Sequence, residues 1–215
     1  MEDMNGLKDK IVVTEISEKD LQKIKKDLHF IELLSKLAKG KECRLIVSGG
    51  YAVDGSLGRL TRPHGDIDVE IYGNSDNVGL VNQLIETIQQ TEPSFSDTTL
   101  LDKEQQDYYH SFVVKGKGFG ADIYYVQVTG NPFDSDKYVV KKDGTTTERQ
   151  EYGTVNVTLD GVAFEAVDPT SELVDKLYKR QIRGDEPKSK HDQDIDNLKL
   201  ITDAREVETR LAGMK

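Results

Sequence analysis

The sequence has a single cysteine, no excess of basic residues and no long apolar run. Cys43 has no second cysteine with which to form an intrachain disulfide, so a reducing cytoplasm is the expected location. No run of about 18 apolar residues is present, and the N-terminus lacks the apolar core of a signal peptide. These absences exclude a disulfide-stapled scaffold and predict a chain without a membrane-spanning helix.

Acidic residues outnumber basic ones by 39 to 29, which gives a net charge of −10. A protein that binds nucleic acid or an anionic membrane in bulk needs a basic face, so this charge argues against both partners. The balance suits a cationic small substrate, although many soluble proteins are acidic. A length of 215 residues is enough to bury a core without a disulfide or a structural metal.

Apolar periodicity divides the chain into expected elements. Ser17 is a good N-cap for a helix that ends at Gly40, and the clean alternation from Asp66 to Tyr72 predicts a half-buried strand. The polar stretch 141–151 is expected to be a mobile loop, and residues 1–16 a leader. The other expected elements are strands over 44–48, 107–115, 121–129, 138–140, 154–159 and 162–164, and helices over 51–57, 77–90, after Asp168 and after Ser189.

Strands dominate up to residue 166 and helices follow. This order predicts an α/β (α+β) fold, with a mixed β-sheet, flanking helices and a small C-terminal helical region. The catalytic domain is expected to span residues 1–166. The helical region, residues 167–215, is expected to pack on it rather than to fold independently, because no linker-like stretch separates them.

Asp66 and Asp68 lie two residues apart in an expected strand, so their side chains leave the same face with Cα atoms about 6.5–7 Å apart. Carboxylates placed in this way repel each other unless a cation sits between them. Mg²⁺ takes oxygen ligands and keeps positions open for phosphate oxygens. The alternative is a solvated strand face, which explains most such pairs. Glu70 shares the face, either as a third acid or as a solvated side chain.

Ser48, Gly49 and Gly50 form a turn directly after an apolar strand. Glycines at this position let backbone N–H groups point at a phosphate, and the N-terminus of the following helix adds its dipole. An ordinary strand-to-helix turn is the alternative reading of the same residues.

Cations lie between this turn and the carboxylates. Arg59, Arg62 and His64 suit a triphosphate or its pyrophosphate leaving group, and charge balance on a loop is the alternative. His64 either titrates near neutral pH or only donates a hydrogen bond. Lys190, at the start of the penultimate helix, could reach a phosphate or belong to a solvated basic turn.

Asp122 is the only acid within an otherwise apolar strand, ADIYYVQV. Such an acid must be paired or bind a metal to offset its desolvation. If this strand lies beside the strand of Asp66 and Asp68, three carboxylates meet. Asp122 could then bind metal or act as general base on an acceptor hydroxyl.

Two segments of this region, GGYAVD over 49–54 and LGRLTRPHGDID over 57–68, resemble the signature of the aminoglycoside and lincosamide antibiotic nucleotidyltransferases. These enzymes belong to the DNA polymerase β-like nucleotidyltransferase superfamily. The resemblance extends more weakly to Asp122, which matches the third acid of the family, and to residues 188–191, which are similar to its C-terminal Lys-His segment. Residues 97–159 do not align.

The resemblance implies a nucleotidyltransferase fold and transfer of a nucleoside monophosphate, usually AMP from ATP, to a hydroxyl of a small acceptor with Mg²⁺. Pyrophosphate is the other product. The roles that it implies are phosphate binding by Ser48 and Gly49, metal binding by Asp66 and Asp68, general base or third metal ligand for Asp122, and phosphate neutralisation by Lys190 and Arg62.

The acceptor stays open, because the antibiotic-binding residues of the family do not map onto this chain. A toxin-like nucleotidyltransferase that modifies tRNA or a protein keeps the reaction and changes the acceptor, but RNA would need a basic groove beside the site. A nucleotide-binding module without turnover is a further alternative.

Overall fold

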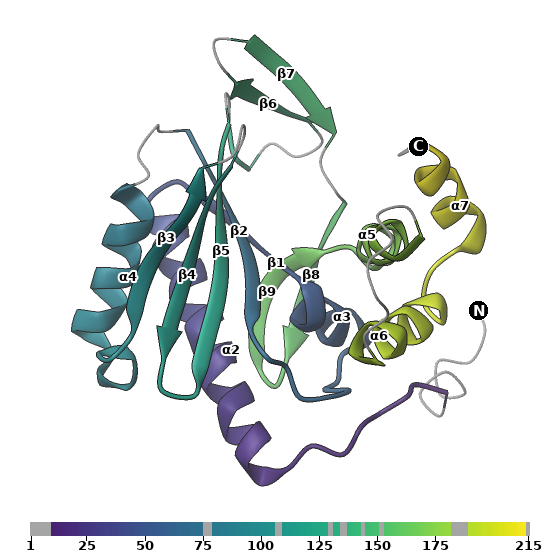
Figure 1. Cartoon of the computed structure of the whole chain (residues 1–215), viewed down its shortest axis with the longest axis horizontal. Helices are drawn as coiled ribbons and strands as arrows, with labels where there is room; N and C mark the ends of the chain where they lie inside the picture. The colour runs from purple at the N-terminus through teal and green to yellow at the C-terminus, as the bar shows by residue number, and fades with distance from the viewer. Residues whose placement is uncertain are drawn as a thin grey trace.

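The computed structural model describes residues 10–74, 79–105, 109–128, 131–133, 137–142, 145–150, 153–181 and 189–213. A mixed β-sheet forms its centre (Figure 1). Its strands are β1 (Arg44–Ser48), β2 (Ile67–Gly73), β3 (Thr99–Gln105), β4 (Tyr109–Gly116), β5 (Phe119–Gln127), β8 (Thr154–Leu159) and β9 (Val162–Val167). These seven strands lie in the order β3-β4-β5-β2-β1-β9-β8. The mixed sheet of the predicted nucleotidyltransferase fold is thus confirmed.

Strand direction changes along the sheet. β2 pairs with β1 antiparallel and with β5 parallel, and β1 pairs with β9 parallel. The pairs β3–β4, β4–β5 and β8–β9 are antiparallel. The central strand β2 therefore joins an antiparallel neighbour on one side to a parallel neighbour on the other.

Two helices cover one face of the sheet. They are α2 (Glu18–Gly40) and α4 (Gly79–Thr91), shown in purple and blue-teal in Figure 1. The predicted cap is confirmed, because Ser17 and Asp20 form a reciprocal capping box at the start of α2. The buried stripes of both helices pack on the apolar face of β2 and β5, through Ile67, Val69, Ile71, Ala121 and Ile123.

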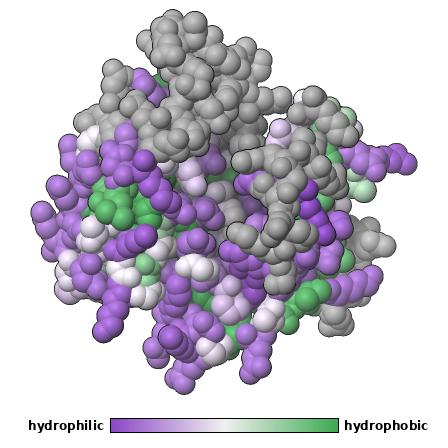
Figure 2. All heavy atoms as spheres, in the orientation of Figure 1, coloured by the Kyte–Doolittle hydropathy of each residue, from purple (hydrophilic) through white to green (hydrophobic). Residues whose placement is uncertain are grey.

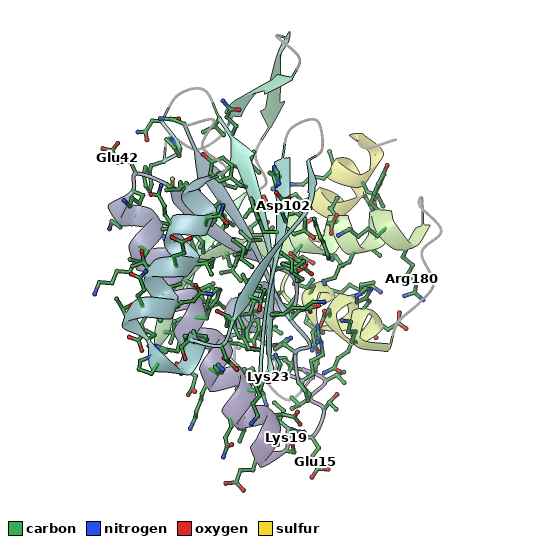
Figure 3. All side chains as sticks on the ribbon, turned by 60° about the vertical axis from the view of Figure 1, so that its left-hand side comes forward. Glu15, Lys19, Lys23, Glu42, Asp102 and Arg180 are labelled. Carbon is green, nitrogen blue, oxygen red and sulfur yellow. The ribbon has the colours of Figure 1, made fainter. Side chains whose placement is uncertain are left out.

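The remaining helices form a second packed group. They are α3 (Gly49–Leu57), α5 (Pro169–Gln181), α6 (Ser189–Lys199) and α7 (Ala204–Gly213). Figure 1 shows the last three together on one side of the sheet, next to α3. Their common core consists of Val53, Leu173, Val174, Ile195, Leu198 and Val207. Arg180, labelled in Figure 3, pairs with Asp192 and so joins α5 to α6.

Three features differ from the sequence expectations. β3 was not expected, because its sequence TLLDKEQ carries charged residues, and it forms through pairing with β4. Part of the expected polar loop 141–151 forms β7 (Thr145–Gln150), which pairs with β6 (Lys137–Lys142) in a separate hairpin. A short 3₁₀ helix, η1 (Pro93–Phe95), is also additional. For the two strands, local sequence gives a weak signal that pairing with a neighbouring strand overrides.

The molecular surface is largely hydrophilic on the face shown in Figure 2, with small apolar patches between charged side chains. Among the described residues, the exposed large apolar side chains are Val12, Val13, Leu21, Leu101 and Phe133. No helix in these residues is long and apolar enough to cross a membrane. Cys43 is buried, and burial raises the pKa of its thiol, as expected for a packing residue rather than a nucleophile.

Candidate active site

Three of the predicted site residues lie in one row across three adjacent strands. Asp68 on β2 is the register partner of Ser48 on β1 and of Asp122 on β5. The prediction that the strand of Asp122 lies beside the strand of Asp68 is therefore confirmed. Asp66 immediately precedes β2 and is exposed. The backbone pairing alone brings these polar side chains to one face of the sheet.

The carboxylates create a strongly negative site. The pKa of Asp68 is raised to about 6, first by burial and then by the neighbouring charges of Asp66, Asp122 and Glu172, against the opposing effect of Lys176. A cation would relieve this repulsion, and oxygen ligands are those that Mg²⁺ prefers. The donor set therefore fits a magnesium ion.

Protein side chains alone do not complete a metal site. In the ranges that the structure describes, no group of three or more histidine, cysteine, aspartate or glutamate side chains is placed to hold an ion. Asp122 Oδ1 lies 3.5 Å from Lys103 Nζ. Mg²⁺ is usually bound by one or two carboxylates together with substrate phosphates and water, so Asp66 and Asp68 would suffice as protein ligands for it.

The glycine turn is shaped by the side chains around it. Gly49 has a φ of +68°, and a Cβ atom there would lie 2.4 Å from Asp68 Oδ2. At Gly50 a Cβ atom would lie 2.3 Å from His64 Nδ1 and 2.8 Å from Arg62 Nη2. The helix α3 begins at Gly49, two residues before the predicted start at Tyr51, and the Ser48 side chain does not cap it. Both glycines thus let the turn lie directly against the carboxylate and the cations.

A chain of buried charges connects this turn to α5 and α6. The Gly49 N–H donates to Glu172 Oε2 at 3.2 Å, and Lys176 Nζ lies 3.2 Å from both Glu172 Oε1 and Asp194 Oδ2. Arg62 donates to the two Asp194 oxygens through Nε at 2.9 Å and Nη2 at 2.8 Å. Burial lowers the pKa of Lys176, but Glu172 and Asp194 outweigh it, and the net pKa is raised. Lys176 therefore stays charged beside the turn.

Sequence reasoning missed three members of this series of buried charges. Glu172 and Lys176 lie four residues apart on α5, and Asp194 lies on α6. Spacing of four on a helix signals only a common surface pair. Their role depends on where α5 and α6 dock, and local sequence patterns do not predict this docking.

His64 belongs to a buried network beneath the turn. Its Nε2 lies 2.7 Å from Asp54 Oδ2, and its ring centroid is 4.3 Å from that of Tyr51. The Tyr51 hydroxyl donates to Asp27 Oδ2 on α2 at 2.6 Å, and Lys23, labelled in Figure 3, pairs with the same oxygen at 2.6 Å. These contacts hold the histidine ring in place against Gly50.

Residues 12–14, the N-terminal strap, hold α6 against the loop that precedes β2. Asn197 accepts from the Val12 N–H at 2.8 Å and donates to the Val12 carbonyl at 3.0 Å. Gln193 donates to the carbonyl oxygens of Val12 at 3.0 Å and Thr61 at 3.1 Å, and Thr14 N–H donates to the Thr61 carbonyl at 2.7 Å. Residues 12–14 of the expected leader therefore have a defined position next to the site.

These elements enclose a small pocket. It is lined by Gly49, Gly50, Arg62, His64, Gly65, Asp66, Asp68, Lys176, Lys190, His191 and Asp194. Six of the eight predicted site residues are among them, and the other two, Ser48 and Asp122, lie in the register row of Asp68. Arg62 lines the pocket, but its charge is already paired with Asp194.

Comparison with solved structures finds the same fold. The antibiotic-resistance factor ANT(2'')-Ia in solution matches with a TM-score of 0.61 and 18% identity, over 88% of this chain and 91% of that chain. A crystal structure of ANT(2'')-Ia with adenylyl-2''-tobramycin matches with a TM-score of 0.59 and 17% identity, over 86% and 95%. The lincosamide adenylyltransferase LnuA, with lincomycin bound, gives 0.54 and 17%, over 88% and 100%.

Comparison of sequences gives the family. A search of curated proteins gave no match. The family model described as aminoglycoside-2''-adenylyltransferase matches residues 29–198, which contain all the predicted site residues. Because this match covers most of the chain, the protein belongs to the aminoglycoside-2''-adenylyltransferase family.

Proposed function

We propose that this protein is a magnesium-dependent adenylyltransferase that moves AMP from ATP to a hydroxyl group of a small antibiotic-like acceptor. The observation that carries the proposal is the row of Ser48, Asp68 and Asp122 beside a glycine turn that opens a helix. An acid pair and an anion-binding turn in direct contact are what phosphoryl-transfer chemistry requires.

The nucleotide would lie with its phosphates at the turn. The N-terminus of α3 favours an anion through its dipole and the backbone amides of its first turn. Lys176 and Lys190 line the same pocket and supply positive charge, and Arg62 adds a guanidinium fixed by Asp194. When Mg²⁺ is bound at Asp66 and Asp68, it supplies charge neutralisation at the phosphate oxygens.

Asp122 would act as the general base. Its side chain is partly exposed, at 28%, and its residue is the register partner of Asp68, which supports this role. The acceptor hydroxyl would give its proton to Asp122 as its oxygen attacks the α-phosphorus. A new P–O bond forms to the acceptor, the bond to the bridging oxygen breaks, and pyrophosphate leaves with the electron pair.

The acceptor class comes from the family and from the charge of the protein. ANT(2'')-Ia has been solved with an adenylylated tobramycin and LnuA with lincomycin. A net charge of −10 suits a cationic acceptor such as an aminoglycoside and disfavours a polyanionic one such as tRNA. A cytoplasmic location, where ATP is available and Cys43 stays reduced, fits this proposal.

The decisive test mixes the protein with Mg²⁺, the four nucleoside triphosphates and a panel of aminoglycosides, lincosamides and tRNA. Mass spectrometry of the acceptors should find AMP added to one of the antibiotics, with an equal amount of pyrophosphate released. An adduct on tRNA alone would support the toxin-like alternative. Binding of ATP without pyrophosphate release from any acceptor would support a non-catalytic module.

A further inference from the structure

A carboxylate occupies the start of α3, where the proposed function places a phosphate. Glu172 reaches from α5 and accepts the Gly49 N–H through Oε2 at 3.2 Å. Its side chain is almost completely buried, with 5% of the residue exposed. The first amide of a helix is where an anion binds most readily, so Glu172 fills this position with an anion from the protein itself.

The second oxygen of the same carboxylate engages the neighbouring cation. Glu172 Oε1 lies 3.2 Å from Lys176 Nζ, and this lysine lines the pocket. One side chain therefore uses both the backbone amide and the ammonium group that an incoming phosphate oxygen would need. Lys176 keeps a second carboxylate partner, because Asp194 Oδ2 also lies 3.2 Å away.

Part of the surroundings opposes the negative charge of this carboxylate. Burial and the charge of Asp175 raise the pKa of Glu172, and Lys176 and the Gly49 N–H offset this only in part, so the net pKa is raised. Glu172 also contributes to the repulsion at Asp68. A carboxylate that is opposed by desolvation and by neighbouring negative charge loses less free energy when it is displaced than one in a favourable electrostatic environment.

From these contacts we propose that Glu172 is an internal competitor for the nucleotide: its carboxylate occupies the Gly49 amide and Lys176, and the phosphates of ATP bind by displacing it. This inference rests on the proposed function, because it takes the phosphate position from there. Glu172 thereby sets the affinity for nucleotide and keeps Lys176 paired when no nucleotide is present.

A simple helix cap makes the opposite prediction. If Glu172 only capped α3, its replacement would loosen the turn and weaken nucleotide binding. If it competes, its replacement frees a positive amide and a lysine, and nucleotide binding becomes tighter. The sign of the change in affinity separates the two roles.

The test variant is Glu172→Gln, which keeps the shape and can still accept from Gly49, but gives up the ion pair with Lys176. The matched control is Asp175→Asn, which removes one negative charge from the same helix at a partly exposed pair with Lys179. Isothermal titration with ATP in EDTA, and with inorganic tripolyphosphate, measures the phosphate site without a metal. We expect Glu172→Gln to bind both roughly tenfold more tightly than wild type, and Asp175→Asn to change far less.

Equal or weaker binding by Glu172→Gln overturns the inference, as does an equal gain in Asp175→Asn. Circular dichroism and the melting temperature check folding, and Glu172→Asp, with its carboxylate one methylene further back, serves as a second variant with an expected intermediate affinity. Tighter binding without AMP transfer by any variant would leave the inference standing and refute the proposed function. AMP transfer by wild type without tighter binding in Glu172→Gln would refute the inference alone.

Discussion

Asp68 and Asp122 are register partners in adjacent parallel strands, so the sheet itself holds two carboxylates on one face. Their Cα positions are fixed by backbone pairing rather than by a ligand. Each strand also places apolar residues on the opposite face, in the main core. The fold therefore bears the cost of the repulsion, and the site is organised before substrate binds.

Replacement of Asp68 by asparagine should stabilise the metal-free protein and abolish AMP transfer. The carboxylate is desolvated by burial and lies near the charges of Asp66, Asp122 and Glu172, so removal of its charge relieves a desolvation and repulsion cost of about 1–2 kcal/mol. Differential scanning fluorimetry in EDTA should show a higher melting temperature for Asp68→Asn than for wild type. Mg²⁺ with ATP should raise the melting temperature of wild type only.

Asp160→Asn is the control for that experiment, because Asp160 is exposed in the β8–β9 turn with a φ of +48°, a conformation that asparagine tolerates. Its melting temperature and activity should match wild type. Wild-type turnover by Asp68→Asn would refute the role of Asp68 at the metal.

Replacement of Gly50 by alanine should damage the site through a steric clash. The new Cβ would lie 2.3 Å from His64 Nδ1 and 2.8 Å from Arg62 Nη2, and both side chains are held by other contacts. We expect a loss of about 1–3 kcal/mol in the free energy of unfolding and a fall in kcat/KM of more than tenfold. Urea unfolding and steady-state kinetics measure the two effects.

Gly40→Ala is its matched control. Gly40 ends α2, and a Cβ there would meet no atom within 4 Å. Because alanine favours a helix, this variant should be as stable as wild type or up to about 1 kcal/mol more stable. If Gly50→Ala behaves in the same way, the close packing of the turn against His64 does not matter for function.

Sequence alone predicted the half of the site that is local. Gly49, Asp66 and Asp68 lie within one short stretch, and strand alternation shows which side chains share a face. Asp122 could be found because an acid in an apolar strand must be paired or bind a metal to offset its desolvation. Its position beside Asp68 depends on the parallel pairing of two strands that are distant in sequence, and local sequence does not predict that pairing.

The other half depends on docking of the C-terminal helices. Glu172 and Asp194 belong to helices rich in charged residues, where two buried acids look like surface ones. Their burial follows from the packing of Leu173 and Ile195 on Val53 of α3. The strap was missed for a related reason: its contacts are made by the backbone of Val12, which carries no side-chain signal.

Replacement of Asn197 by alanine should loosen α6 and weaken nucleotide binding. The amide of Asn197 is completely buried and pairs with both the N–H and the carbonyl of Val12. Its loss leaves backbone groups without these partners, at a cost of about 1–3 kcal/mol in stability. Because α6 carries Lys190 and Asp194, we expect the KM for ATP to rise severalfold with a smaller change in kcat.

The control for the strap is Asn156→Ala, which removes an exposed amide from β8, away from α6. It should leave the melting temperature and the KM for ATP unchanged. A KM for ATP in Asn197→Ala equal to that of wild type would show that the strap stabilises the fold without acting on the site.

The stability that Asp194 contributes should disappear in acid. Burial raises the pKa of its carboxyl, but the hydrogen bonds from Arg62 and the charge of Lys176 outweigh burial and lower the net pKa. A carboxyl with a lowered pKa stabilises the fold fully above its unfolded-state value of about 3.9 and loses this effect as the pH falls through the folded-state pKa. Asp194→Asn should therefore cost about 3–5 kcal/mol of stability between pH 5.5 and 8, because it leaves two buried cations short of a partner.

Urea unfolding of wild type and Asp194→Asn should show the stability difference shrinking below about pH 4. The exposed control Asp196→Asn should show almost no difference from wild type at any pH. A difference that persisted unchanged into strong acid would mean that Asp194 acts through its shape and not through its charge.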